Sequence, residues 1–510
     1  MSIATDTRRN SWEALVSWYY GLNPTIRLIL RWILIAVLTV VAFRASLSNL
    51  VVTTREGGLV GYVWVIPFAA LLAAVGVAIR RRTELPIHDR QTDIIVGTMG
   101  LVLALMFQGV LLRRYAEYFH LLRLDLFAMW IFVLSSAIVL FGVRPVARFG
   151  WVWLLTSMVF SLPYQVMVIV LGGGTLAAAV ASLFIAAPAT AVAVGGTHRR
   201  AFVGAVAAFA LGLMVLLLMH YLVPGAPLLA YQLVPSLAPI VLVGGVAFFR
   251  LRRGKPLRVL DRKVEPLAAK QVWAAVPLVV AVAVVLAFIP LPKQQSALVI
   301  SRSAPYDLVP GLALVVPSGW AVTKVETNVD DVRRYYGEDA VLVRQRMTAL
   351  SGDARFDKFA RPRTLMVDSI VSSLPYSFDA YTGRVLYDTT GARLSRSQPV
   401  DLGHGVHGRI LSVIDDRLLV TWDVLRFAWG DDEQDQIVGV FAVDNHENDA
   451  PFPDPRSGLV STLRDLFTVL FRGNAVTEQN RPTFKDAELL TEFGRQLVAA
   501  QFEHGAAAHS

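Results

Sequence analysis

Long apolar runs recur through the first 291 residues of the chain. A helix needs about 20 mostly apolar residues to cross the roughly 30 Å hydrocarbon core of a bilayer. A mean hydropathy of +0.52, with only 17% charged residues, agrees with a polytopic membrane protein. The runs predict about nine membrane spans, at 28–43, 58–79, 94–112, 124–143, 150–171, 175–196, 201–222, 228–249 and 272–291.

Basic residues are unevenly distributed between the loops that connect these spans. If the N-terminus is inside, the inner segments at 1–27, 80–93, 144–149, 197–200 and 250–270 contain 19 Lys and Arg, whereas the outer loops contain 5. Lys and Arg are retained on the cytoplasmic side of membranes. The pattern predicts a cytoplasmic N-terminal segment (1–27), a transmembrane bundle (28–291) and an extracytoplasmic C-terminal domain, in a cell (inner) membrane.

After residue 292 the sequence becomes typical of a water-soluble domain. Segments 458–471 and 486–502 place apolar residues at helical spacing and predict two amphipathic helices. We expect an α+β domain over 292–502, followed by a disordered tail at 503–510. The β-branched and aromatic runs predict strands within 313–326, 339–350, 363–371, 408–430 and 435–444, with a hairpin turn at Asp415 and Asp416.

Cysteine is absent from all 510 residues. This excludes structural disulfides, cysteine-ligated metal centres and thiol nucleophiles. The net charge of +9 combines +15 before residue 292 with −6 after it. The basic surplus is therefore a signal of membrane topology, and we expect no nucleic-acid partner.

Polar residues gather at the predicted outer face of the bundle. Interfacial anchoring and hydrogen bonding between helices account for many such residues. Polar groups at membrane depth are nevertheless costly, which makes them candidates for function. The main candidate site consists of Arg114, His120, Arg123, Gln165 in the fifth predicted span and His220 at the end of the seventh.

A second polar stretch occupies the inner loop at 80–93. Its three leading arginines end the second span, and Thr92 or Asp93 is placed to cap the next helix. His88, Asp89 and Arg90 remain as a dense cluster and form the inner-loop candidate site. No metal-binding or nucleotide-binding motif is completed there.

The C-terminal domain offers two weak metal-binding patterns. His404 and His407, with Asp401, provide an H-x-x-H on a glycine-rich segment, but no third and fourth ligands are indicated. The acidic run at 430–435 is typical of a solvated hairpin loop. We therefore expect neither a metal nor a cofactor.

The order of several stretches resembles the exosortase/archaeosortase family of multi-span membrane proteins. These stretches are GGLVGYVWVIPFAALLAAVGVAIRRR, LFGVRP, SLPYQ and PSLAPIVLVGGVAFFRLRR. The part from VPSGWAV onward is loosely similar to the extracytoplasmic domain appended in some members. The resemblance implies a protein that acts on C-terminal sorting tails of secreted proteins at the outer membrane face. The family's proposed nucleophile is a cysteine, which this chain lacks, so no catalytic residue carries over.

The leading hypothesis is an exosortase-like integral inner-membrane protein of the bacterial cell envelope without cysteine transpeptidase activity. It would act in assembly or sorting of exported protein or polysaccharide, with membrane lipids and the envelope machinery as partners. One alternative is an active sorting peptidase or transferase with a non-cysteine nucleophile. Another is a transporter, since prolines at 163, 188, 235 and 239 interrupt spans, although the spans lack coupling acids.

Overall fold

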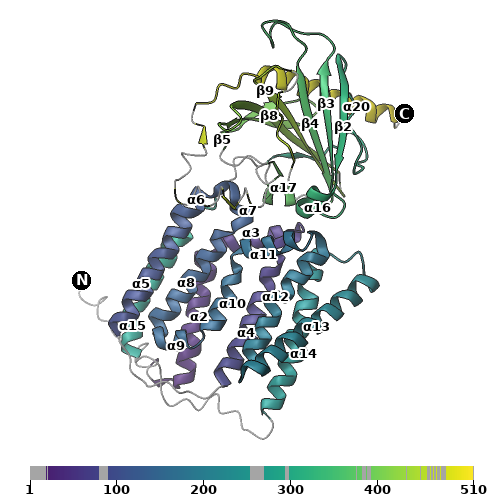
Figure 1. Cartoon of the computed structure of the whole chain (residues 1–510). Coiled ribbons are helices and arrows are strands. Elements are labelled where there is room, and N and C mark those ends of the chain that lie inside the picture. The colour runs from purple at the N-terminus through teal and green to yellow at the C-terminus, as the bar shows by residue number, and fades with distance from the viewer. Residues whose placement is uncertain are drawn as a thin grey trace, which may run out of the picture.

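The chain folds into a helical bundle followed by a sheet domain that sits over one end of the bundle (Figure 1). The computed structural model describes residues 19, 21–79, 90–252, 269–292, 298–374, 376–381, 386–387, 392–431, 433–447, 450–455, 460, 463–464, 467, 471, 478–479 and 481–508.

Seven helical segments among the described residues are long and apolar enough to cross a membrane. They indicate a membrane-spanning protein, as the sequence predicts. The segments are α2 (Pro24–Ala42), η1 with α4 (Leu59–Trp64 and Val65–Ile79), α5 continuing through η2 and α6 (Arg90–Met106, Phe107–Leu111 and Leu112–Arg114), α8 (Leu124–Phe141), α12 (Gly174–Val194), α13 (His198–Leu222) and α14 (Leu228–Arg252).

Two of the nine predicted spans take a different form. The span predicted at 150–171 is bent by 70° between α10 with η4 (Gly150–Thr156 and Ser157–Val159) and α11 (Ser161–Val170). Pro163 explains the bend, because its ring would clash with the Val159 carbonyl in a straight helix. The last span corresponds to α15 (Ala269–Ala287), whose apolar part, Val272–Ala287, is shorter than a full span. The predicted number of nine is therefore not established.

Small residues let the bundle helices approach closely. A Cβ atom at Gly76 of α4 would lie 2.4 Å from the Cα of Ala193 in α12. Replacing Gly76 with alanine is expected to destabilise the bundle by about 1–3 kcal/mol, because the backbone of α12 must move away. Thermal unfolding of the detergent-solubilised protein measures this loss.

Gly245 in α14 provides the matched control for that substitution. Among the described residues, no atom outside the backbone of its own helix lies within 4 Å of a Cβ placed there. Alanine at Gly245 should leave the melting temperature unchanged or slightly raised, since alanine favours helices. Equal melting temperatures for the two variants would contradict the close approach of α4 and α12.

The C-terminal domain is built on one sheet with the strand order β10-β5-β7-β8-β9-β4-β3-β2. Its long central strands pair antiparallel, whereas β1 and β10 join in parallel. The strands are β1 (Ile300–Ser301), β2 (Trp320–Asn328), β3 (Val341–Ala349), β4 (Thr364–Ser372), β5 (Arg393–Ser395), β6 (Gln398–Asp401), β7 (His407–Asp415), β8 (Val420–Gly430), β9 (Asp435–Val443) and β10 (Glu478–Gln479).

Most predicted strands are confirmed, and the run 408–430 forms β7 and β8 around a turn after Asp415. The prediction at 313–326 is wrong in its first half, because β2 begins only at Trp320. Pro317 lacks a backbone N–H, and Gly319 has a positive φ of 84°, so neither suits a strand there.

Helix α20 (Ala487–Ala508) covers the face of the sheet that points away from the bundle. It confirms the helix predicted at 486–502 and continues through 503–508, where we expected a disordered tail. Gly505 allows this extension to pack directly against the Pro305 carbonyl. Of the second predicted helix, 458–471, the described residues 460, 463–464, 467 and 471 are helical.

The other face of the sheet points toward the bundle across two short helices, α16 (Asp330–Tyr336) and α17 (Tyr376–Ala380) (Figure 1). Buried apolar residues from the bundle, these helices and the sheet form one continuous group, which we call the junction cluster. It includes Leu112, Phe119, Leu122, Leu124, Ile169, Tyr336, Tyr376, Phe378, Met366, Trp422 and Phe441.

Candidate functional site

The candidate site lies where helix α7 (Phe119–Leu122) ends and α8 begins. Arg123 joins the two helices in a left-handed backbone conformation, with φ 46° and ψ 50°. Its side chain is completely buried, as is that of Asp125. Arg123 Nε and Nη2 donate hydrogen bonds to the two carboxylate oxygens of Asp125, and each is 3.1 Å long. The pair is therefore bidentate, and the guanidinium charge is neutralised inside the protein.

Two further groups surround the Arg123 guanidinium. It lies over the Phe119 ring, 5.1 Å from the ring centroid. The Tyr376 hydroxyl interacts with it electrostatically, whereas Nη1 meets no acceptor with hydrogen-bond geometry among the described residues. The Arg123 guanidinium is thus enclosed by a ring face, a carboxylate and a phenol, and it is part of the protein core.

Tyr376 reaches this site from the sheet domain. Its hydroxyl and Nδ1 of His120 share a hydrogen bond of 2.7 Å, and the two rings meet edge to face with centroids 5.0 Å apart. On another side the ring touches the turn after α3 (Arg44–Arg55), since a Cβ at Gly58 would lie 2.8 Å from Tyr376 Cδ1. His120, Arg123 and Gly58 thus form a socket for Tyr376.

Gln165 completes the bundle side of the site. Its amide Nε2 donates to the carbonyl oxygens of His120 at 3.0 Å and Leu121 at 3.3 Å, and Ser161 Oγ donates to the latter as well. These carbonyls lie at the C-terminal end of α7 and have no partners within that short helix. The bend before α11 brings Ser161 and Gln165 to this position, where both act as caps.

The pKa values of His120 and Tyr376 do not favour proton transfer between the two side chains. Burial, reinforced by the neighbouring Arg123 charge, lowers the pKa of His120 to about 3. Burial raises the pKa of Tyr376 above its ordinary value. Moving a proton from Tyr376 to His120 is therefore strongly uphill, and the pKa of His120 lies far below the near-neutral value at which a general base is most effective.

The low pKa of His120 predicts a pH-dependent stability. The unfolded chain binds a proton on this histidine below about pH 6.5, whereas the folded protein does not until about pH 3. Stability from His120 is therefore complete above pH 6.5 and is lost as the pH falls. Between pH 6.5 and 5.0 the loss should approach about 2 kcal/mol, measurable as a falling melting temperature.

A His120→Gln variant isolates that effect, because glutamine can hydrogen-bond Tyr376 without titrating. Burial raises the pKa of Asp379 in α17 to about 6, which acts in the opposite sense on acidification. Asp379 is present in both proteins, so their difference reports His120 alone. Parallel pH profiles for the two proteins would show that the buried histidine does not control stability.

The remaining candidates from the sequence lie elsewhere. His220 is exposed in the last turn of α13, and among the described residues no hydrogen bond or ion pair joins it to the socket. Arg90 and Arg114 lie at opposite ends of the α5–α6 segment, about 36 Å apart by helix geometry. Arg90 donates a hydrogen bond of 2.9 Å to the Val139 carbonyl. His88 and Asp89 lie outside the described residues. Of the candidates among the described residues, His120, Arg123 and Gln165 lie together at α7, and Arg114 ends α6 shortly before it.

Asp93, considered as a cap for its own helix, has another role. Its carboxylate accepts a hydrogen bond of 2.7 Å from the backbone N–H of Val143. This N–H begins α9 (Val143–Ala147), which follows α8. Asp93 therefore caps a neighbouring helix across the bundle.

A second buried polar group lies deeper in the bundle and escaped the sequence analysis. Tyr62 and Tyr164 stack with ring centroids 3.7 Å apart. Gln232 Nε2 donates to Tyr164 Oη at 3.0 Å and to the Leu59 carbonyl at 2.7 Å. Gln232, like Gln165, is an amide within an apolar run, and this signal in the sequence could have identified it. The group links η1, α11 and α14.

The two weak metal-binding patterns do not form a ligand set. His404 stacks on Phe502, and His407 Nδ1 lies 3.9 Å from Asp401 on the exposed surface. In the acidic run, Asp431 accepts hydrogen bonds from the backbone N–H groups of its own turn. Within the described part of the chain, no three His, Asp or Glu side chains converge on a common point.

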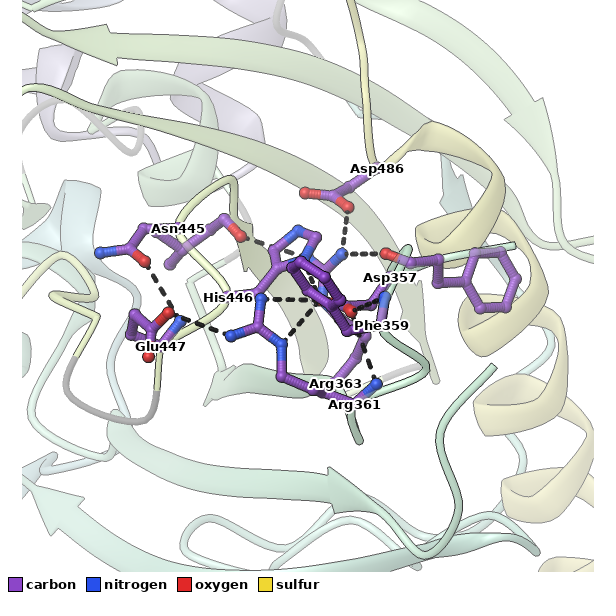
Figure 2. A network of polar contacts seen from close by, with 10 residues as sticks. Asp357, Phe359, Arg361, Arg363, Asn445, His446, Glu447 and Asp486 are labelled. Atoms are coloured by element: carbon purple, nitrogen blue, oxygen red, sulfur yellow. Dashed lines mark hydrogen bonds and ion pairs between the residues drawn. The ribbon is translucent and has the colours of Figure 1, made fainter. Parts of the chain in front are cut away.

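A polar network in the sheet domain also has a structural role (Figure 2). Asp357 accepts hydrogen bonds from Arg361 and from the Phe359 N–H, and it lies 2.6 Å from Nδ1 of His446. Arg361, followed by His446, holds the pKa of Asp357 well below its usual range. The network fastens the loop between β3 and β4 to the end of β9.

Beside it, Arg363 pairs with Asp486 at 2.8 Å and so fastens the same loop to the start of α20. Among the described residues, His446 pairs with the Asp357 carboxylate and not with a hydroxyl nucleophile, which argues for a clamp within the domain.

Comparison with known proteins assigns no relative to this arrangement. No protein-family model, curated protein or solved structure matches the chain. The function is therefore argued from the socket of His120, Arg123 and Gly58 and from the domain that fills it.

Proposed function

We propose that this protein is an exosortase-like integral membrane protein of the bacterial cell envelope that lacks transpeptidase activity. Its bundle holds the sheet domain in a fixed position outside the cell, where the domain docks exported protein or polysaccharide during assembly or sorting. The observation that carries this proposal is the Tyr376 socket, in which residues that could serve catalysis are occupied by the protein's own domain.

Three properties of the socket support a docking role. Arg123 is neutralised by Asp125, so its charge is not directed at a substrate. His120 has too low a pKa to take a proton from a hydroxyl group. The chain also supplies no thiol. A group buried in this way stabilises the contact between the bundle and the sheet domain.

A second candidate function rests on the same hydrogen bond. A tyrosine hydroxyl 2.7 Å from a histidine and beside an arginine has the arrangement of an activated nucleophile. In this alternative, a sorting peptidase or transferase opens the junction and the Tyr376 oxygen attacks a peptide carbonyl. An ester to Tyr376 forms, the peptide C–N bond breaks, and the amine leaves with the proton that His120 took from the hydroxyl group. In the closed structure the pKa of His120 is lowered and that of Tyr376 is raised, which makes catalysis the weaker candidate.

Tyr376→Phe separates the two functions, because phenylalanine fills the socket but has no nucleophile. Docking predicts that full-length Tyr376→Phe captures envelope components in native membranes as the wild type does, whereas Tyr376→Ala captures less. Catalysis predicts that Tyr376→Phe abolishes the processing of secreted proteins, which intact-mass spectrometry detects.

Tyr381→Phe is the matched control for this experiment. Tyr381 is equally buried, but its hydroxyl has no hydrogen-bond partner among the described residues. A processing defect in Tyr376→Phe but not in Tyr381→Phe would establish the enzymatic alternative. Failure of the wild-type protein to capture any envelope component would overturn the docking proposal.

A further inference from the structure

We propose that the membrane-distal rim of the sheet domain binds an apolar segment of an exported polypeptide that carries an acidic residue. This inference rests on the proposed docking function and names its site and its partner. The rim consists of two loops, 350–363 between β3 and β4 and 416–419 between β7 and β8. Large apolar side chains are strongly exposed on both loops: Leu350 by 70%, Phe359 by 68%, Leu418 by 51% and Leu419 by 87%. A group of such side chains on a folded domain is typical of a contact surface.

The two loops lie at the same end of the sheet and are joined by the residues that follow β9. Asp444 and Thr421 exchange two hydrogen bonds of 3.0 Å, which fastens this stretch to the start of β8. The same stretch reaches the β3–β4 loop through His446, whose Nδ1 lies 2.6 Å from the Asp357 carboxylate (Figure 2). By the strand order the centres of the two loops are three strand spacings apart, about 15 Å. One short peptide can therefore contact both loops.

Both loops are fixed by the same arrangement around a buried carboxylate. Asp357 accepts hydrogen bonds of 2.7 Å from the Phe359 N–H and 3.0 Å from the Arg361 guanidinium. Asp415 accepts hydrogen bonds of 2.8 Å from the Arg417 N–H and 3.0 Å from the Arg417 guanidinium. Each of the two carboxylate side chains is only 1% exposed. A loop held in this way loses little conformational freedom when a partner binds, so the rim is preorganised.

Leu419 is unfavourable for folding in two respects. Its backbone φ of 53° lies in the left-handed region, where glycine or asparagine is the usual residue of a turn. Its apolar side chain is also almost fully exposed. In the other loop Ala360 is left-handed as well, with a φ of 51°. Backbone strain that the surrounding structure enforces is concentrated at functional sites. A strained, exposed leucine in this position therefore points to binding.

The position of the rim limits what can occupy it. β3 begins shortly after α16, which packs against α11 and α12, and its nine residues extend about 30 Å. Figure 1 shows the far ends of β3 and β4 on the side of the domain away from the bundle, where lipid does not reach. A second copy in the same membrane would hold its rim at the same height and facing the same way. Two rims therefore cannot meet, and the occupant comes from the surrounding compartment.

The side chains of the rim favour a polypeptide over a polysaccharide. Leucine offers a sugar neither a hydrogen bond nor a flat ring, whereas it buries well against apolar side chains. The Phe359 ring has cations beside it, with Lys358 Nζ 4.8 Å and Arg361 Cζ 5.5 Å from its centroid. Arg361 pairs with Asp357 and Glu447. Lys358 has no carboxylate partner among the residues that the structure describes, so an acidic residue of the bound segment would complete its pairing.

Short random peptides displayed on phage provide the probe, and they are selected on the full-length protein in nanodiscs. The wild type is expected to enrich peptides that carry Leu or Phe next to Asp or Glu. Lys358→Glu should enrich peptides with Lys or Arg in place of the acidic residue. Val325→Asn is the matched control, because Val325 is 51% exposed on β2, outside the rim. This variant should enrich the same peptides as the wild type.

Leu419→Asn separates binding from folding. Asparagine adopts the left-handed conformation readily, so the melting temperature should stay the same or rise, whereas recovery of the enriched peptides should fall several-fold. Equal recovery by Leu419→Asn and the wild type would overturn the proposal, and so would a wild type that enriches no peptide. A wild type that enriches no peptide but captures envelope components in the Tyr376 experiment would retain the docking function and lose only the rim as its site.

Discussion

Replacing Asp125 with alanine is expected to destabilise the folded protein by about 3–5 kcal/mol, because the Arg123 guanidinium would remain buried without its counter-charge. Neither partner can reach water, and the remaining neighbours of the cation are a ring face and a phenol. Since single domains are commonly stable by only 5–15 kcal/mol, the variant should give little monodisperse protein after extraction. Size-exclusion profiles and thermal unfolding in detergent measure this loss.

A double variant, Arg123→Leu with Asp125→Leu, provides the decisive comparison. Replacing both members of a buried pair with apolar residues is often neutral, since no charge is then left in the interior. The left-handed conformation of residue 123 costs about 1–2 kcal/mol for leucine, but arginine already bears the same cost, so it cancels in the comparison with the wild type. Recovery of the double variant would show that the pair stabilises the junction. An Asp125→Ala protein as stable as the wild type would contradict its burial.

Alanine at Gly173 is expected to separate the sheet domain from the bundle near α16. Gly173 has a φ of 79°, and a Cβ there would lie 2.5 Å from the Cα of Arg334. Its φ of 79° with a ψ of −174° is a conformation essentially confined to glycine and contributes about 1–3 kcal/mol, and the displaced backbone contributes another 1–3 kcal/mol. Because both effects act at one contact, we expect α16 to move away from the start of α12.

The neighbouring Gly172 is the matched control, because it also has a positive φ but lies in open surroundings. Gly172 has a φ of 102°, but a Cβ there would meet nothing within 4 Å. Its alanine variant should show the strain without the displacement. The readout is crosslinking of cysteines placed at Thr175 and Glu338, whose side chains are 3.5 Å apart. Crosslinking should slow several-fold for Gly173→Ala alone, and equal rates would show that α16 tolerates the added methyl group.

The elements that the sequence predicts well are those set by local periodicity. The apolar residues of α20 recur at helical spacing, and all are buried between this helix and the sheet: Leu489, Leu490, Phe493, Leu497 and Val498. The alternation in β8 likewise directs Trp422 and Val424 to the junction and Leu425 and Phe427 to α20. In both cases the spacing of the residues along the chain fixes which of them share a face, so no knowledge of distant contacts is needed.

The candidate site was predicted in part for a different reason. His120, Arg123 and Gln165 are conspicuous because they are polar beside apolar spans, and the structure brings them together. Tyr376 could not be identified, since a tyrosine in a soluble domain is ordinary and its partner is 256 positions away. The pairing of Arg123 with Asp125 was missed as well, because residues i and i+2 of a helix point in different directions and meet here through the left-handed turn at Arg123 between α7 and α8.

The 70° bend between α10 and α11 raises the question of whether this part of the chain crosses the bundle or turns back to the same side. α8 begins beside the Tyr376 socket and α12 begins beside α16, so both start at the end of the bundle that carries the sheet domain. A chain that leaves this end along α8 must return before α12 starts, and only α10 and α11 lie between after α9. We therefore expect the bent pair to act as one crossing and not as a re-entrant hairpin. Compartment reporters inserted after Ala147 and after Leu171 should then read opposite sides, and every assignment of inside and outside further along the chain depends on that result.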